Sequence, residues 1–272
     1  MKSVFRITLA LLLSVFVFLT VACDAASNDL MEGASPSTSA LGLFHFDGEM
    51  VTRSFVFNSD EVQQILDELS AVRATEVSDW SLDDIALPMF GLSMGAVSGD
   101  TINVAWSNGL WITQDGRAYR FDFDFDELQQ EYNWEATDRF LSFTAFPNAR
   151  LFAQDESGWD SRFLTPAPPI DPPDGITMTL NSWESDTVSV DITNDTDMEW
   201  MYGEHFELQI LLDGTWREVP AVSGDLVFID IGLIVQAGET SEHIYNLQMF
   251  GDLPAGTYRF VAYGLYVEHT IS

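Results

Sequence analysis

The chain has 272 residues, and its 43 acidic against 11 basic side chains give a formal net charge of −32. This charge excludes nucleic acid as an expected partner, because nucleic-acid binding rests on Lys and Arg that neutralise phosphates. Lys2 is the only lysine and lies in a leader segment, so P-loop nucleotide binding, Schiff-base catalysis, Ser-x-x-Lys acylation and Lys–Asn isopeptide crosslinks are excluded as well.

Residues 1–22 have the order of a secretory signal peptide. Lys2 and Arg6 form a basic start, Ile7–Leu19 is an almost unbroken apolar run, and small residues precede Cys23. The apolar run is shorter than the roughly 20 residues that a membrane-spanning helix needs. The sequence therefore predicts export rather than a retained membrane span.

The end of this segment resembles the signal of bacterial lipoprotein precursors, in which a small residue precedes the cysteine that is acylated. Ala22 and Cys23 fit, whereas Thr20 stands where Leu is usual. The resemblance implies a lipid on Cys23 and a place at the outer face of the cytoplasmic membrane; free secretion after cleavage is the alternative. Cys23 is the only cysteine, so an anchor also accounts for a thiol that has no disulfide partner.

The segment 23–42 is rich in Ala, Ser, Asp and Asn and has no apolar periodicity. We interpret it as a flexible tether. As a random coil, its 20 or so residues would reach roughly 25 Å.

Residues 43–164 are predicted to form an α+β domain with an antiparallel sheet. An Asp47-Gly48 pair between apolar runs predicts a hairpin. Asn58 is a plausible helix cap, and apolar residues follow it at helical spacing. These residues are Val62, Ile65, Leu66, Leu69 and Val72.

A meander is predicted over 101–125, with turns at Asn108-Gly109 and Asp115-Gly116. Aromatic and acidic residues alternate strictly along its last part, which predicts a strand with one aromatic and one acidic face. The aromatic members are Tyr119, Phe121, Phe123 and Phe125. A helix over 127–137 and a strand over 141–152 should follow. No motif places this domain in a family.

Five prolines fall within residues 165–175, which predicts an extended, semi-rigid linker. The rest of the chain, 176–272, carries about seven short alternating strands with turn signals between them, the pattern of an Ig-like β-sandwich. The fold class is therefore β-rich, with an α+β domain followed by a sandwich.

The second domain resembles a bacterial Ig-like domain found in Gram-positive surface proteins. The matching residues are Tyr202-Gly203, Phe206, Leu208, Asp213-Gly214, Trp216, Val219-Pro220, Ala237-Gly238-Glu239 and Leu253–Arg259. Gln209 stands where the family usually has Glu, and Phe250-Gly251 where it usually has Tyr-Gly. The resemblance implies a module outside the cell without established catalytic residues. Tyr258 follows a Pro-Ala-Gly turn, where a tyrosine corner is expected.

Gly91-Leu-Ser93-Met-Gly95 matches the G-x-S-x-G elbow of α/β-hydrolases. That motif needs a strand-to-helix turn, and the residues around it predict a meander. We therefore expect a Gly-rich turn rather than a nucleophile.

Two acidic segments are weak candidates for calcium. The candidate ligands are Asp122, Asp124 and Asp126 in the first domain and Asn194, Asp195 and Asp197 in the second. An EF-hand is excluded, because Glu127 and Asn133 stand where it needs Gly and Glu. A solvated acidic surface is the simpler interpretation. The four histidines have no metal-ligand spacing, so no zinc site is expected.

These observations predict a non-catalytic, lipid-anchored surface protein that acts as an interaction or structural module of the cell envelope. No catalytic residue and no cofactor other than calcium is proposed. The expected partners are the membrane, through Cys23, and an envelope protein or glycan. Two alternatives stay open: a solute- or glycan-binding lipoprotein with an aromatic cleft in 43–164, and a hydrolase that uses carboxylates or Ser93.

Overall fold

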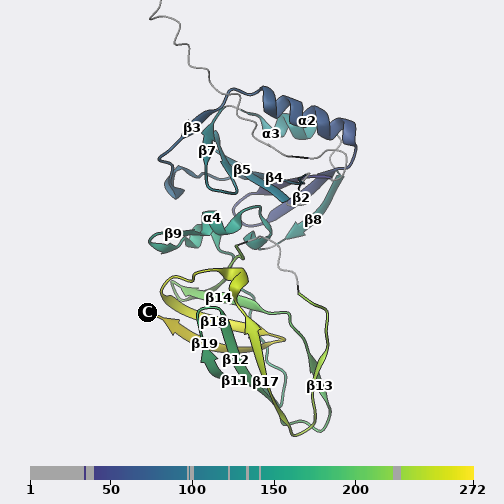
Figure 1. Cartoon of the computed structure of the whole chain (residues 1–272), viewed down its shortest axis with the longest axis vertical. Helices are drawn as coiled ribbons and strands as arrows, with labels where there is room; N and C mark the ends of the chain where they lie inside the picture. Colours follow the sequence, from purple (N-terminus) through teal and green to yellow (C-terminus); the bar gives the residue numbers. More distant parts are fainter. Residues whose placement is uncertain are drawn as a thin grey trace, which may run out of the picture.

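The computed structural model describes residues 34, 40–96, 98, 101–121, 123–132, 135–140, 142–222 and 228–272. Two β-rich domains lie one above the other along the long axis of the molecule (Figure 1). The β-rich fold class, with an Ig-like domain at the C-terminal end, is confirmed.

The described part of the first domain forms an eight-stranded sheet in the order β3-β7-β6-β5-β4-β1-β2-β8, with antiparallel pairing throughout. Its strands are β1 (Leu41–Phe46), β2 (Val51–Val56), β3 (Thr75–Val77), β4 (Met89–Gly95), β5 (Thr101–Ser107), β6 (Leu110–Thr113), β7 (Ala118–Arg120) and β8 (Glu135–Phe140). The sheet begins at Leu41, inside the predicted tether, because Leu41 is fully buried and pairs with Val56.

This sheet is apolar on both faces. Leu41 and Leu43 pack toward helix α2 (Ser59–Ala71), whereas Phe44 and Phe46 pack on the opposite side. Adjacent strand residues point to opposite faces, so a run with little polar interruption buries both of them. One layer is formed by α2 and α3 (Figure 1), and the other by the segment that leads to the second domain.

Helix α2 forms as predicted. The side chain of Asn58 accepts hydrogen bonds from the backbone N–H groups of Asp60 and Glu61, which satisfies two donors of the first turn. Four of the five predicted core residues are buried; Val72 is instead the C-cap.

The predicted strand up to residue 125 is wrong. Strand β7 ends at Arg120, and Asp124 caps helix α3 (Phe125–Glu131) by accepting a hydrogen bond from Glu127 N at 2.9 Å. Phe125 then stacks on Phe90, with ring centroids 5.2 Å apart. The helix predicted over 127–137 is also misplaced, since β8 begins at residue 135.

The predicted strand over 141–152 is wrong as well. The chain forms the 3-10 turn η2 (Phe143–Ala145) and the short helix α4 (Ala149–Ala153), followed by strands β9 (Gln154–Asp155) and β10 (Gly158–Trp159) and the turn η3 (Ser161–Phe163). Another 3-10 turn, η1 (Leu82–Asp84), precedes β4. Phe143, Phe146 and Phe152 are all buried. A compact turn brings these three rings to one apolar layer, which an alternating strand would place on two faces.

The second domain is a sandwich of two main sheets and a ribbon. One sheet is β11 (Ile176–Trp183), β12 (Thr187–Asn194) and β17 (Thr240–Asn246); the other is β15 (Thr215–Glu218), β14 (Glu207–Leu212), β18 (Gly256–Ala262) and β19 (Leu265–Ile271). Strands β13 (Trp200–Tyr202) and β16 (Leu233–Val235) form the ribbon, and the 3-10 turn η4 (Gln248–Phe250) follows β17.

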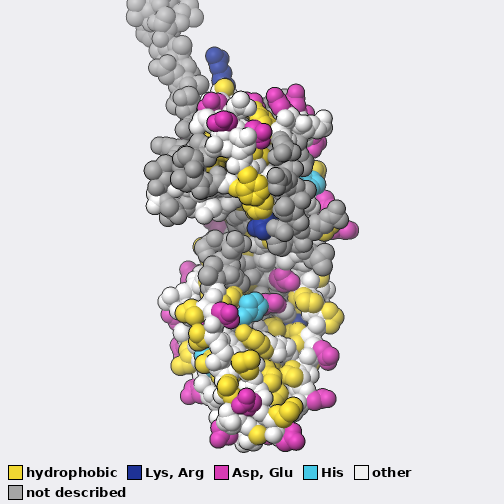
Figure 2. Space-filling model, turned by 90° about the vertical axis from the view of Figure 1, so that its right-hand side faces the viewer, with side chains coloured by type: hydrophobic (Ala, Val, Ile, Leu, Met, Phe, Trp, Pro, Cys, Tyr) yellow, Lys and Arg dark blue, Asp and Glu magenta, His cyan; other side chains and the backbone are white. Residues whose placement is uncertain are grey.

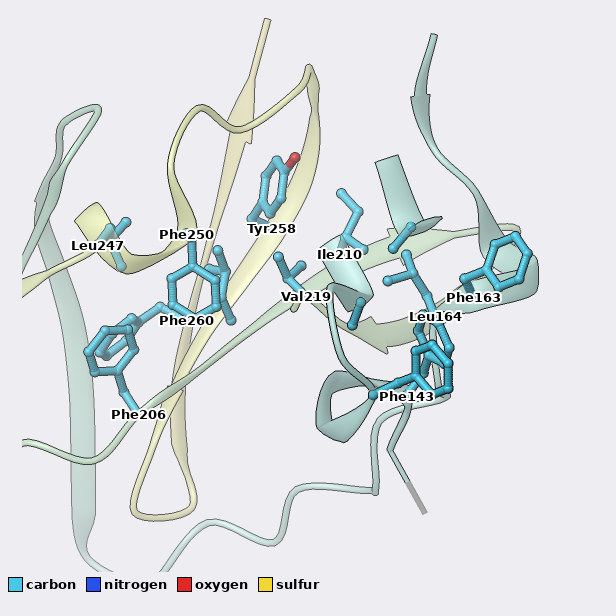
Figure 3. Close-up of a cluster of buried hydrophobic side chains, with 14 of the residues drawn as sticks. Phe143, Phe163, Leu164, Phe206, Ile210, Val219, Leu247, Phe250, Tyr258 and Phe260 are labelled. Carbon is cyan, nitrogen blue, oxygen red and sulfur yellow. The ribbon is translucent and has the colours of Figure 1, made fainter. Parts of the chain in front are cut away.

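The two domains share one apolar core. Phe143, Phe163 and Leu164 belong to the same buried cluster as Ile210 and Val219 of the sandwich. Figure 3 shows these side chains as a continuous row that leads from one domain into the other. The apolar layer below the first sheet is therefore completed by the second domain.

The start of the predicted Pro-rich linker is held by backbone hydrogen bonds. Glu218 N donates to Thr165 O at 3.0 Å, and Ala167 N donates to Trp216 O at 2.8 Å. Phe143 N also donates to the hydroxyl of Thr165 at 2.7 Å. Thr165 therefore connects the first domain to β15 at the point where the chain leaves that domain.

Tyr258 makes the tyrosine corner that the sequence predicts. Its hydroxyl donates to Pro254 O at 2.7 Å and accepts from Trp159 Nε1 at 2.8 Å. Arg150 lies over the Trp159 ring at 4.3 Å and donates to Asp252 O at 2.7 Å. Burial lowers the pKa of Arg150 to about 10. The Tyr258 hydroxyl therefore makes one hydrogen bond within the sandwich and one to Trp159 of the first domain.

We expect Tyr258→Phe to lower the free energy of unfolding by about 1–3 kcal/mol, because it leaves a buried carbonyl and an indole N–H without their partner. Chemical denaturation measures this change. Tyr266→Phe is the matched control, since it removes the same hydroxyl from a ring that is 40% exposed. Equal effects of the two substitutions would contradict the role of the corner.

Candidate functional site

Ser93 lies in the middle of a strand. It pairs with Gly42 of β1 and with Asn103 of β5. The expected Gly-rich turn is therefore wrong, because residues 89–95 form a strand. Ser93 also does not lie on the strand-to-helix turn that a nucleophilic serine of this motif needs. Packing explains why residue 91 is a glycine, because a Cβ there would lie 3.0 Å from the ring of Pro147.

The first group of calcium candidates does not converge. Asp122 lies outside the described residues. Asp124 is used as the cap of α3, and Asp126 lies in the first turn of the same helix, exposed. A capping carboxylate already accepts a backbone N–H, which accounts for Asp124 without a metal.

In the second group, Asn194 is fully buried and its amide is occupied. Its Nδ2 donates to Met198 O and Val235 O, and its Oδ1 accepts from Thr196. Asp195 and Asp197 are exposed. Within the described ranges there is no group of three or more His, Cys, Asp or Glu side chains placed to hold a metal ion.

Cys23 lies outside the described residues, so the structure does not bear on its lipidation. Among the helices that the structure describes, none has the length and apolar character to cross a membrane.

A cleft of about 340 Å³ opens at the junction of the two domains, and we call it the junction cleft. It is lined by the turn after β1, by the segment that runs into the linker, and by one residue of β15. The lining residues are Phe46, Gly48, Glu49, Phe143, Ser161, Arg162, Phe163, Leu164, Thr165, Pro166 and Arg217. Three of the lining residues from 43–164 are phenylalanines, and Arg217 is contributed by the second domain.

The two arginines of the cleft differ in their pairing. Arg162 forms an ion pair with Asp160, in which Nη2 and Oδ2 lie 2.6 Å apart, and this pair raises the pKa of Arg162. Arg217 donates from Nη1 to Leu164 O at 2.5 Å. Its Nε is buried without a hydrogen-bond partner, and no carboxylate lies within ion-pair distance of it in the described part of the chain.

Glu218 follows Arg217 directly but does not neutralise it, because adjacent residues of a strand point to opposite faces. Burial raises the pKa of the Glu218 carboxyl, and a hydrogen bond with Ser142 partly offsets that rise. The junction therefore contains an acidic and a basic group on two sides of β15, each with its own surroundings.

A second surface feature is a set of exposed aliphatic side chains on the β13–β16 ribbon and on the segments that flank it in the sequence, which we call the apolar ribbon. The residues and their exposed fractions are Met198 71%, Met201 66%, Ile229 73%, Ile231 43% and Ile234 50%. Met201 and Ile234 are cross-strand partners. Figure 2 looks at the side of the molecule on which β13 lies in Figure 1, and hydrophobic side chains spread over that face of the second domain.

The sequence departure at Gln209 is accommodated inside the sandwich. Gln209 is buried, and its Oε1 accepts from Arg259 Nε at 3.1 Å and from Nη2 at 2.7 Å. The Arg259 guanidinium lies 4.2 Å from the Trp216 ring and 5.1 Å from the Tyr266 ring. Burial lowers its pKa. This pair is structural, since its groups are satisfied by each other and by the two rings.

Comparison with known proteins supports the Ig-like assignment. Residues 173–265 match the family model of a bacterial Ig-like domain. The comparisons found no match among curated proteins and none among solved structures. The matched range contains both the apolar ribbon and Arg217, whereas most of the junction cleft belongs to the first domain.

Proposed function

We propose that this protein is a non-catalytic, lipid-anchored interaction module at the outer face of the cytoplasmic membrane, and that it binds an envelope partner through the apolar ribbon. The bacterial Ig-like domain supports a surface or structural module. The exposure of the apolar ribbon is the observation that carries the binding role.

The anchor rests on the leader. Ala22-Cys23 resembles a lipoprotein processing site, and Cys23 is the only cysteine of the chain. The sheet of the first domain begins at Leu41, so a chain held at Cys23 reaches the first domain before the Ig-like domain.

Cys23→Ser should move the full chain from the membrane fraction of its producer to the soluble fraction. Unchanged membrane association of that variant would contradict the anchor.

The apolar ribbon is costly to leave in water. Burial of one aliphatic side chain contributes about 1.5–3 kcal/mol, and contiguous exposed apolar side chains mark contact surfaces on soluble proteins. Glu199 and Asp230 are exposed and lie next to members of the apolar ribbon in the sequence. Apolar side chains with acidic neighbours favour a protein partner that presents apolar and basic side chains.

The test is co-sedimentation of residues 24–272 with envelope from the producer. We expect the double variant Met201→Ser, Ile234→Ser to weaken retention at least about tenfold, since it removes two apolar contacts of 1 kcal/mol or more each.

Ile244→Ser and Phe57→Ser are the matched controls, because Ile244 and Phe57 are 61% and 62% exposed but lie outside the apolar ribbon. Both should be retained like the parent. Retention of the double variant at the parent's level, or no retention of the parent, would contradict the proposal.

A further inference from the structure

We propose that the junction cleft is a binding site for a small molecule with a single carboxylate and an apolar body, and that Arg217 pairs with that carboxylate. This site is separate from the apolar ribbon, so the two proposals stand or fall independently.

The charge of Arg217 is the first argument. Outside the leader, the chain has 43 acidic residues and nine arginines, yet the described residues give Arg217 a carbonyl and no carboxylate. A half-buried cation without a counter-charge has lost part of its hydration free energy, and no ion pair offsets that loss. An anion in the cleft would supply the missing partner, and a guanidinium binds carboxylates with two parallel hydrogen bonds.

The position of Arg217 is fixed before any ligand arrives. Its Nη1 bond to Leu164 O ties the guanidinium to the edge of the first domain. Thr165, the next residue, is held on both sides by hydrogen bonds to Phe143 and Glu218. A preformed donor loses little conformational entropy on binding, which favours affinity from few contacts.

The floor of the cleft is aromatic. The Phe46 and Phe143 rings lie 4.6 Å apart, and Phe143 and Phe163 lie 5.6 Å apart. The three rings are only 1–3% exposed, so they fix the shape of the floor and present little surface of their own to a ligand. The volume of about 340 Å³ is at the small end of ligand sites, roughly 300–1,000 Å³.

The remaining polar groups argue for one negative charge rather than several. Arg162 is already paired with Asp160, so Arg217 is the free cation among the described lining residues. Glu49 is exposed and also lines the cleft, and it would repel a polyanion. The net charge of the whole chain opposes anion entry only weakly, because salt screens charges beyond about 8 Å at physiological ionic strength.

Benzoate is the probe, because it combines one carboxylate with an aromatic ring. At roughly 0.3–0.5 kcal/mol per heavy atom, a ligand of this size should bind with a Kd on the order of millimolar. The protein from Asp24 onward keeps every described element. Its arginine Nε–H resonances are followed by NMR as benzoate is added at constant ionic strength.

We expect a saturable shift of the Arg217 resonance, and no such shift with the neutral analogue benzamide. Arg217→Gln should weaken benzoate binding at least about tenfold, since a charge-assisted hydrogen bond contributes about 1.5–3 kcal/mol. Exposed Arg73→Gln, which changes the net charge equally, should leave the affinity unchanged.

Arg217→Gln also removes the bond to Leu164, so a second variant covers a loss of folding. Glu49→Gln removes an exposed charge from the rim and should tighten benzoate binding about twofold, whereas Glu184→Gln on the second domain should not. Absence of saturable binding up to about 100 mM, roughly tenfold above the weakest expected Kd of about 10 mM, would overturn the proposal. Equal binding of benzamide, or no response to either cleft variant, would overturn it as well.

Discussion

The apolar core that crosses the domain junction is the contact on which the rest of the structure depends. Phe143, Phe146 and Phe163 lie on the side of the first sheet opposite helix α2, and they belong to one buried cluster with side chains of the sandwich. Without that contact, large aromatic side chains would face water, each at a cost of about 1.5–3 kcal/mol for a fully buried Phe. The fold is therefore best understood as one packing unit with two sheet systems.

This shared core has consequences for every surface considered above. It lies beside the junction cleft, which is lined by residues of both domains. It also places Arg217 of β15 beside Leu164 of the first domain. The same contact makes Trp159 a partner of the tyrosine corner, which ties the hydrogen-bond network of the sandwich to the other domain.

Local signals made several elements predictable. Helix α2 follows from its apolar spacing and its Asn58 cap, and the corner at Tyr258 follows from the turn before it. The alternation of Phe and Asp before residue 125 predicted a strand that the chain does not form, because Asp124 caps helix α3. The strand predicted over 141–152 failed for another reason: the apolar side chains there pack in the cluster at the domain junction and do not alternate along a strand.

The junction itself had no signature in the sequence. Trp159 and Tyr258, or Leu164 and Arg217, are distant along the chain, and their pairing arises only from how the domains pack. Prolines after Thr165 favoured a spacer, whereas backbone bonds from Glu218 and Ala167 anchor its start. The apolar ribbon could have been found from the aliphatic residues around 229–234, but their exposure depends on the ribbon lying outside the two main sheets.

The most direct test of the shared core is the unfolding of residues 24–272, followed by hydrogen exchange in increasing denaturant, with peptides from α2 and from β18 as separate reporters. The account predicts one coincident transition. It also predicts that Phe163→Ala lowers the stability of both reporters together by about 3–5 kcal/mol, whereas Phe57→Ala, at a 62% exposed position, changes neither. Two separate transitions, with Phe163→Ala affecting the α2 reporter alone, would contradict it.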